Sequence, residues 1–342
     1  MSMSVGGQAV IEGVMMRTPG SMAVAVRRAD GTIEVRDDAW YSITQRVPLL
    51  KAPFLRGAVV LFESMHNGVS ALTWSAERQE LDDAADDAPD DAEDADAAPE
   101  AGSWAMTATI GLSLMFSFGL FVALPHILAI VGGQLLGIEA LDGQSTLFHG
   151  VAGVLKLMIF LGYLWSISRL DDIHRVFQYH GAEHKAIYAW EAQQELNVDN
   201  ARAHTRLHPR CGTSFLFIVV MTSILVFAVV FGSFELPIEN RILKQLSLIG
   251  MKLPLLFPIA GIAFEFQRLS ARFPNAFWVR PLIWPGLMLQ KITTQEPTDD
   301  QLEVALASLK VALAREAEVQ QTDSSVRLER RERQFSDYAA VV

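Results

Sequence analysis

The stretch Thr213–Phe234 reads TSFLFIVVMTSILVFAVVFGSF and contains no charged side chain. As an α-helix, a run of this length can cross the hydrocarbon core of a bilayer, which is roughly 30 Å thick. Three more apolar runs occur at Ala105–Gly133, Leu147–Ile167 and Leu246–Gln267, and the last of them contains Lys252 and two prolines. The sequence therefore predicts an α-helical polytopic membrane protein with about four spans and a small cytoplasmic α+β part.

Basic residues are spread unevenly over the loops between these runs. The loop 169–212 joins two expected transmembrane hairpins, 104–168 and 213–268, and it contains six basic residues: Arg169, Arg175, Lys185, Arg202, Arg206 and Arg210. The loops at the other ends of the runs contain only Arg241 and Lys244. Because basic loops stay on the cytoplasmic side of a membrane, we expect both termini and the loop 169–212 in the cytoplasm.

The net charge of −11 comes from one acidic segment. Eleven Asp and Glu residues and no Lys or Arg occur between Glu80 and Glu100, so the remainder of the chain is neutral overall. This segment has no periodic apolar face and its like charges repel, so we expect residues 81–103 to form a disordered linker. Cys211 is the only cysteine, which excludes an internal disulfide.

Residues 1–50 show the pattern of a small β unit. Met22–Arg28 and Thr32–Arg36 are typical of strands, and the Ala-Asp-Gly sequence between them favours a hairpin turn. We expect Val5–Met16 to add a third strand. Residues 51–80 follow as a predicted amphipathic helix on the membrane surface, with a fifth, imperfect span as the alternative.

The C-terminal region 269–320 is expected to be a cytoplasmic interfacial segment followed by a capped helix. Thr298-Asp-Asp-Gln301 has the sequence of a capping box, with acidic side chains at the positive end of the helix dipole. Four leucines follow at helical spacing and predict docking onto the cytoplasmic part: Leu302, Leu306, Leu309 and Leu313. The polar tail 321–342 is expected to fray.

The candidate functional site is the sequence His180-Gly-Ala-Glu183-His184 within a helix predicted from Asp171 to about Gln194. Two histidines four residues apart lie on one face of a helix, one turn from each other. This geometry allows both imidazoles to bind one metal ion, and Glu183 between them can accept a proton from a water molecule.

A third metal ligand has three candidates, Cys211, His208 and Glu265. The first two belong to the turn His208-Pro-Arg-Cys211 ahead of the third span, and a His and Cys ligand set suits zinc. Three protein ligands would form a catalytic zinc site and four a structural one. The alternative is a pair of hydrogen-bonded interfacial histidines with Cys211 as a small apolar filler. Lys185 and Arg210 are candidates for binding an anionic group.

Several longer motifs, taken together, resemble the YqhQ-type bacterial membrane proteins, which carry a domain of unknown function. The resemblance covers nearly the whole chain apart from the acidic linker and the last residues, and rests on these segments: Gly6–Arg17, Arg56–Gly57, Gln178–Lys185, His208–Phe215, Phe264–Phe266 and Pro285–Pro297. It implies a multi-pass protein of the bacterial inner membrane, often described as a predicted metal-dependent enzyme. It implies no particular substrate.

These patterns favour a membrane protein with a zinc site on its cytoplasmic side, acting as a metal-dependent hydrolase at the membrane. The alternative is a non-enzymatic assembly or interaction factor whose His and Cys site is structural or regulatory. A transporter is a third option, based on Lys156 inside the second span and on the broken fourth span. We expect the lipid bilayer and a membrane protein as partners, and no nucleic acid. The H-x-x-E-H sequence also occurs in inverzincin peptidases, but that similarity covers only five residues.

Overall fold

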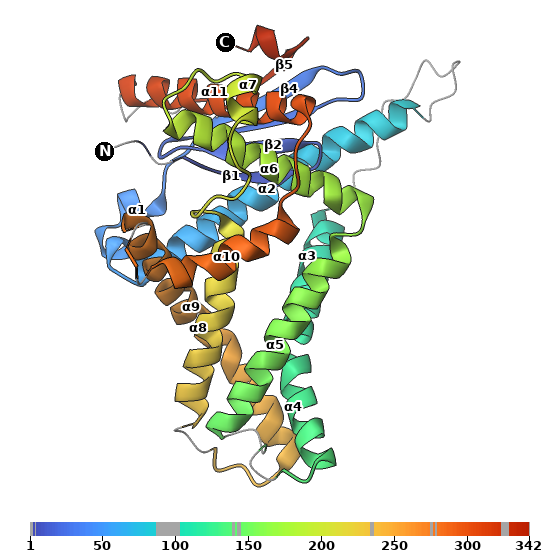
Figure 1. The fold of residues 1–342 in the computed structure, drawn as a ribbon, viewed down its shortest axis with the longest axis vertical. Coiled ribbons are helices and arrows are strands. Elements are labelled where there is room, and N and C mark those ends of the chain that lie inside the picture. Colours follow the sequence, from blue (N-terminus) through green and yellow to red (C-terminus); the bar gives the residue numbers. More distant parts are fainter. Residues whose placement is uncertain are drawn as a thin grey trace.

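The computed structural model describes residues 3, 5–86, 103–138, 141, 145–232, 236–273, 276–277, 279–322 and 328–341. Most of the acidic linker expected at 81–103 lies outside them. The described part is mostly helical, with a small β-sheet at one end of the molecule and long apolar helices that extend away from it (Figure 1). Both chain ends lie at the end with the sheet.

Four helical stretches are long and apolar enough to cross a membrane, judged by length and composition. They are Gly111–Leu135, Thr146–Ile167, Gly212–Gly232 and Ile242–Ser270. The elements that supply them are α3 (Ser103–Phe118), α4 (Leu124–Leu135), α5 (Thr146–Ile167), α8 (Gly212–Gly232) and α9 (Arg241–Arg272). The prediction of about four such helices is confirmed at this level.

Proline has different consequences in the first and the last of these helices. A π-helical turn, Gly119–Ala123, joins α3 to α4 immediately before Pro125, which has no N–H for the helix ladder. In contrast, α9 continues without a break through Pro254 and Pro258. The interruption expected in the fourth run is therefore absent from the described backbone of this helix, which packs against α2 and α8.

The sheet has five antiparallel strands in the order β1-β2-β3-β4-β5. The first four follow one another along the chain: β1 (Gly6–Val10), β2 (Gly13–Arg17), β3 (Ser21–Arg27) and β4 (Ile33–Ala39). The expected hairpin of β3 and β4 is present, with Arg27 opposite Ile33. The single strand expected at Val5–Met16 is instead a hairpin of β1 and β2. Its turn was not recognised because Glu12, not glycine, takes the left-handed conformation, with φ of 49°.

The fifth strand comes from the C-terminal tail. Arg331–Phe335 forms β5, which pairs with β4 at the edge of the sheet, and Val341 beyond it is buried. The expectation of a frayed tail over 321–342 was therefore wrong for this segment. The strand is polar, RERQF, and its backbone pairing is supplemented by ion pairs such as Arg333 with Asp37 at 2.8 Å. A charged edge strand of this kind lacks the alternation of apolar and polar residues from which a strand is predicted.

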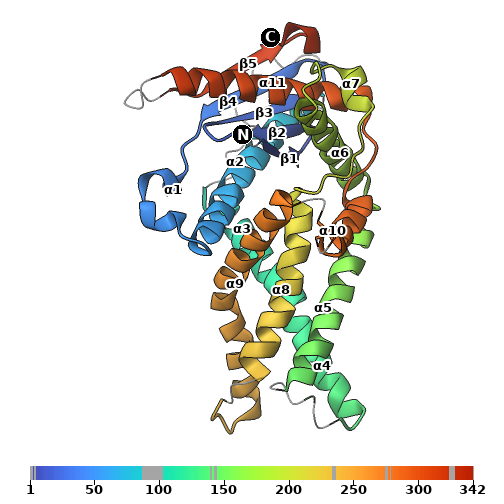
Figure 2. The same cartoon turned by 60° about the vertical axis from the view of Figure 1, so that its left-hand side comes forward.

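Helices cover both faces of the sheet. One face packs on α6 (Asp171–Glu191) and α11 (Asp299–Gln321), and the other packs on the middle of α2 (Leu55–Asp86). Figure 2 shows these layers at the end of the molecule opposite the distal tips of the apolar helices. The capping box at Thr298 and Gln301 starts α11 as expected, and Leu302, Leu306 and Leu309 are fully buried.

Helix α2 connects the sheet to the apolar helices. Ala71 and Trp74 are buried against the sheet, and near its start Gly57 packs on Phe264 of α9. The helix runs to Asp86, beyond the end expected at residue 80. The middle turns of α2 thus cover the sheet and its first turns pack on α9, and α2 is not among the four described stretches that are long and apolar enough to cross a membrane. The short helix α1 (Ile43–Arg46) precedes it.

The remaining helices bring distant segments to α6. The short helix α7 (Val198–Arg202) follows α6, and α10 (Arg280–Thr293) packs against the start of α8, where Gly286 meets Ser214. After α10 the chain crosses α6 in close contact. A Cβ atom at position 181 would lie 2.1 Å from the backbone oxygen of Gln295, so only glycine fits there.

We expect Gly181→Ala to lower the free energy of unfolding by about 1–3 kcal/mol, because the added methyl group forces two backbones apart. Gly162→Ala in α5 is the matched control, since nothing lies within 4 Å of its Cβ position. Denaturant unfolding of both variants checks this. Equal stability of the two variants would contradict the close crossing.

A second prediction concerns the buried ion pair of Asp37 on β4 with Arg315 on α11. The two side chains are each 1% exposed, and their charged atoms lie 3.3 Å apart. We expect Asp37→Ala to destabilise the protein by roughly 3 kcal/mol, because it leaves a buried guanidinium short of countercharge. Asp199→Ala, which removes an 88% exposed carboxylate from its pair with Arg202, should leave the unfolding midpoint unchanged.

Candidate metal centre

Helix α6 presents two imidazoles side by side. The ring centroids of His180 and His184 are 4.5 Å apart, as expected for residues one helical turn from each other. His184 is 1% exposed and the His180 side chain 12% exposed. The pair therefore points into the junction between the sheet end of the molecule and the apolar helices.

The turn before α8 brings a thiol to this pair. The Sγ atom of Cys211 lies 3.1 Å from Nε2 of His180. One ligand atom from each of His180, His184 and Cys211 lies within 4.8 Å of the others. The residues come from segments about thirty positions apart, so the fold, and not local sequence, assembles the cluster.

Hydrogen bonds to backbone carbonyls orient both rings. The Nδ1 atom of His180 lies 2.8 Å from the carbonyl oxygen of Thr293, and Nδ1 of His184 bonds to the carbonyl of Arg206. A carbonyl can only accept, so each Nδ1 carries the proton and each Nε2 is left with a lone pair. This arrangement is common around metal-bound histidine.

The Nε2 atom of His184 is buried and lacks a hydrogen-bond partner of normal geometry among the described residues. Burial lowers the pKa of His184, although the neighbouring Cys211 opposes that shift. A buried, neutral imidazole with an unused lone pair is in the form that binds a metal ion.

Thr213 holds the sulfur atom of Cys211 at the start of α8. Cys211 immediately precedes α8, and the backbone N–H of Thr213 in the first turn of that helix donates to Sγ at 3.4 Å. The hydroxyl of Thr213 is 3.1 Å from the same atom. These two contacts hold the sulfur atom at the first turn of α8, within reach of His180.

Glu183 lies next to the cluster without belonging to it. Its carboxylate is 3.9 Å from Nε2 of His180, and the residue is 5% exposed. Burial raises the pKa of Glu183, while His180, His208 and a backbone hydrogen bond from Gly7 oppose the shift. A Cβ atom on Gly7 would meet the Glu183 side chain at 2.7 Å, so strand β1 can approach the carboxylate only with glycine there. A carboxyl group whose pKa is raised in this way is a candidate for accepting and returning a proton.

His208 is close by but directed elsewhere. Its ring centroid lies 5.6 Å from that of His184, while its Nε2 atom is 3.6 Å from a carboxylate oxygen of Glu191. Burial lowers the pKa of His208, and the charge of Glu183 opposes this. His208 is therefore a neighbour of the cluster and not one of its three ligand residues.

Glu265, the third ligand candidate, lies away from the cluster. It is on α9 and forms a bidentate ion pair with Arg56, in which Nε donates to Oε1 at 2.6 Å. Lys185 and Arg210, the candidates for binding an anion, also have acidic partners, Glu296 and Glu191.

Several residues that shape the site were not singled out as site residues. The Gln290 side chain on α10 bridges the turn: its Oε1 accepts from the backbone N of His208, and its Nε2 donates to the carbonyl of the same residue at 2.8 Å. Thr293 supplies the carbonyl that orients His180. The only sequence signals for Gln290, Thr293 and Gly7 are the longer motifs Pro285–Pro297 and Gly6–Arg17, which show no spacing typical of a site.

A second polar cluster lies among the apolar helices. Lys156 on α5 donates to the hydroxyl of Ser223 at 3.0 Å, and Lys252 on α9 donates to Nδ1 of His126 at 2.8 Å. Both ammonium groups also lie over the ring of Phe227. Lys156, whose charge was the basis of the transporter option, therefore has polar and aromatic neighbours within the helix bundle.

Comparison with known proteins gives a family and no activity. A family model described as "Protein of unknown function (DUF1385)" matches residues 52–315. The chain is 34% identical over 317 residues to a protein of Bacillus subtilis (strain 168) described as "Uncharacterized protein YqhQ". The aligned region covers 91% of this chain and 93% of the relative. No solved structure matches the chain. With a match of this extent, the chain belongs to the DUF1385 family, and the resemblance to YqhQ-type proteins is confirmed.

Proposed function

We propose that this protein is a zinc-binding protein of the bacterial inner membrane, with its metal site on the cytoplasmic side and hydrolysis at the membrane as its activity. The observation that carries the proposal is the convergence of His180, His184 and Cys211, whose ligand atoms lie within 4.8 Å of one another. Histidine nitrogen and cysteine sulfur are both zinc ligands, and three protein ligands are the number found in catalytic zinc sites.

The residues of the cluster fit zinc for a reason independent of any motif. A buried imidazole nitrogen without a hydrogen bond has an energetic cost of about 1–3 kcal/mol, which a bound cation would remove. Bound zinc supplies Lewis-acid activation of a water molecule. The protein's own residues hold the ligands: the carbonyls of Thr293 and Arg206 fix the two rings, and Thr213 supports the sulfur atom.

Glu183 is the proposed general base. Its carboxylate lies within 3.9 Å of the His180 ligand nitrogen, so it can accept a proton from a water molecule in the cluster and later donate it to a leaving group. The raised pKa of Glu183 matches this use, because a base that titrates closer to neutral pH can return the proton.

The membrane location is proposed from length, composition and charge. Four helices are apolar enough to span, and the end with the sheet contains the six basic residues of the segment 169–212. The positive-inside rule then assigns this end, with both termini and the metal cluster, to the cytoplasm. The lipid bilayer is thus the expected partner, and a partner membrane protein stays a prediction.

One observation favours the second candidate function, a non-enzymatic membrane factor with a structural zinc site. His184, Glu183 and Cys211 are 1%, 5% and 6% exposed, so the cluster is closed to solvent on most sides. A structural zinc would fasten α6 to the start of α8 and so connect the sheet end to the apolar helices.

The metal prediction is tested on purified full-length protein by elemental analysis. We expect about one zinc per chain in the wild type, no zinc in His184→Ala, and retained zinc in Glu183→Gln, because the carboxylate is not a ligand. His204→Ala is the matched control, since that imidazole bonds to Gln194 outside the cluster and should retain zinc. Absence of stoichiometric metal from the wild type would refute the site.

The same variants separate the two functions. For an enzyme, Glu183→Gln should melt at the wild-type temperature, yet fail to restore the membrane lipid and metabolite profile of a strain that lacks the gene. For a structural site, Glu183→Gln should restore that profile fully, while a chelator should lower the melting temperature of the wild type.

The topology prediction is tested with single cysteines in a Cys211→Ser background and a membrane-impermeant thiol reagent. Ile242→Cys, at a position 74% exposed beside the distal loop, should react from outside intact spheroplasts. Arg330→Cys, beside the sheet, should react only after permeabilisation, because that end is assigned to the cytoplasm. The reverse pattern would invert the proposed orientation.

A further inference from the structure

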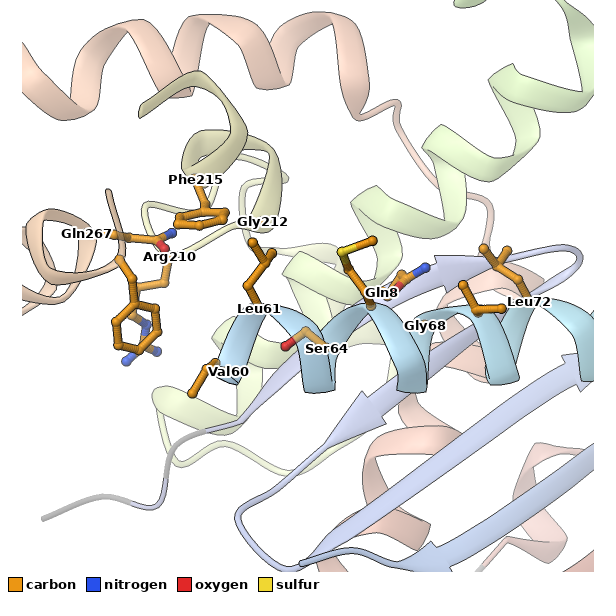
Figure 3. A pocket seen from close by; sticks show the side chains of 13 residues that line it. Gln8, Val60, Leu61, Ser64, Gly68, Leu72, Arg210, Gly212, Phe215 and Gln267 are labelled. Carbon is orange, nitrogen blue, oxygen red and sulfur yellow. The ribbon is translucent and has the colours of Figure 1, made fainter. Parts of the chain in front are cut away.

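An apolar groove lies between α2 and the ends of α8 and α9. Its volume is about 460 Å³, within the range of roughly 300–1,000 Å³ typical of ligand sites. Figure 3 shows α2 along one wall, with Phe215, Arg210 and Gln267 on the other side. The cavity is therefore formed where the sheet end of the molecule meets the apolar helices.

The α2 wall of the groove is an exposed apolar stripe. Met65, Val69 and Leu72 lie at helical spacing on one face, and they are 51%, 40% and 37% exposed. They line the groove together with Phe264 of α9. Uncovered apolar side chains at this density indicate an apolar occupant, since contact with water would be unfavourable.

The groove lies at the level of a bilayer surface. Its far wall contains Gly212 and Phe215, at the first turn of one candidate span, and Gln267, near the end of another. With these helices in a membrane, the groove adjoins the headgroup and upper acyl region of the leaflet on the side of the sheet.

The groove continues into a polar cavity of about 450 Å³. The two share Gln8, Ser64 and Arg210 as lining residues. The polar cavity is further lined by Arg17 of β2 and by the backbone of β1 at Gly7, the same glycine that lies against Glu183. One ligand could therefore have its apolar part on α2 and its polar part beside the sheet.

Arg17 gives the polar cavity a positive charge that has no carboxylate in ion-pair contact among the described residues. Its guanidinium lies over the ring of Trp40 at 4.2 Å and donates to Ser64 Oγ at 3.4 Å, and no carboxylate forms an ion pair with it in the described part of the chain. The acid that acts on its charge, Glu63, accepts instead from Ser42 and from the backbone of Ile43 at 2.6 Å. Arg17 has donors left for an anionic ligand.

We propose that the groove and the polar cavity together bind one anionic phospholipid from the adjoining leaflet. The phosphate group would lie against Arg17 and Gln8, and an acyl chain would cover the stripe Met65–Leu72. A small soluble anion would leave the apolar wall uncovered, and a zwitterionic phospholipid would bring its own ammonium group close to Arg17, next to the phosphate. This site requires no metal, so it goes beyond the proposed zinc chemistry.

The test is native mass spectrometry of the full-length protein exchanged against vesicles of phosphatidylglycerol, phosphatidylcholine or an equimolar mixture of the two. We expect one phosphatidylglycerol to remain bound per chain, and glycerol 3-phosphate not to displace it. Arg17→Gln should weaken retention of phosphatidylglycerol about tenfold, the loss expected for a charge-assisted hydrogen bond. Val69→Trp should weaken it similarly by filling the groove.

Two controls separate the site from general attraction to anionic membranes. Arg169→Gln removes a basic residue at the end of α5, and Phe62→Trp changes a 67% exposed position on α2 that does not line the groove. Both should retain lipid as the wild type does. If Arg17→Gln fails to fold, Arg17→Lys should still prefer the anionic lipid. Equal retention of the two lipids by the wild type would overturn the proposal, as would equal losses in Arg17→Gln and Arg169→Gln.

Discussion

The fixed orientation of two imidazoles by backbone carbonyls is the constraint around which this end of the molecule is organised. The carbonyl of Thr293 bonds to His180 and that of Arg206 bonds to His184, and neither carbonyl belongs to the helix that carries the histidines. Both rings can therefore aim their remaining nitrogen at Cys211 only if α10 and the turn before α8 pack closely on α6. The absence of a side chain at position 181 permits that packing.

The fold was predictable where one physical signal dominates. Length and hydropathy alone located the four apolar helices. A segment that crosses a membrane must form its backbone hydrogen bonds within itself, and a charged side chain inside it is energetically costly, so such a segment is long and apolar. The capping box at Thr298 located the start of α11 for a similar local reason. The turn at Glu12 and the strand Arg331–Phe335 escaped prediction, because a left-handed glutamate and a charged edge strand lack the usual glycine and alternation signals.

The candidate site was predictable only in part. Helical spacing sufficed to place His180 and His184 on one face, and it left Cys211 and His208 of the nearby turn, together with Glu265, as candidates for the third ligand. The choice among them depends on the tertiary structure: Cys211 reaches the two histidines, His208 lies against Glu191, and Glu265 forms an ion pair with Arg56. The position of α10 cannot be derived from residue spacing, so the hydrogen bonds of Gln290 to the backbone of His208 were not predictable from the sequence either.

The sheet draws its strands from opposite ends of the chain, since β4 near the N-terminus pairs with Arg331–Phe335. Its two cover helices α6 and α11 lie before and after the second apolar hairpin. During synthesis the part of the sheet that α11 covers therefore stays uncovered until the last apolar helix has been made. Closure of this domain over such long separations in sequence is entropically costly and slow. Synthesis of the apolar helices thus precedes completion of the domain, and nascent chains released early would expose an aggregation-prone sheet.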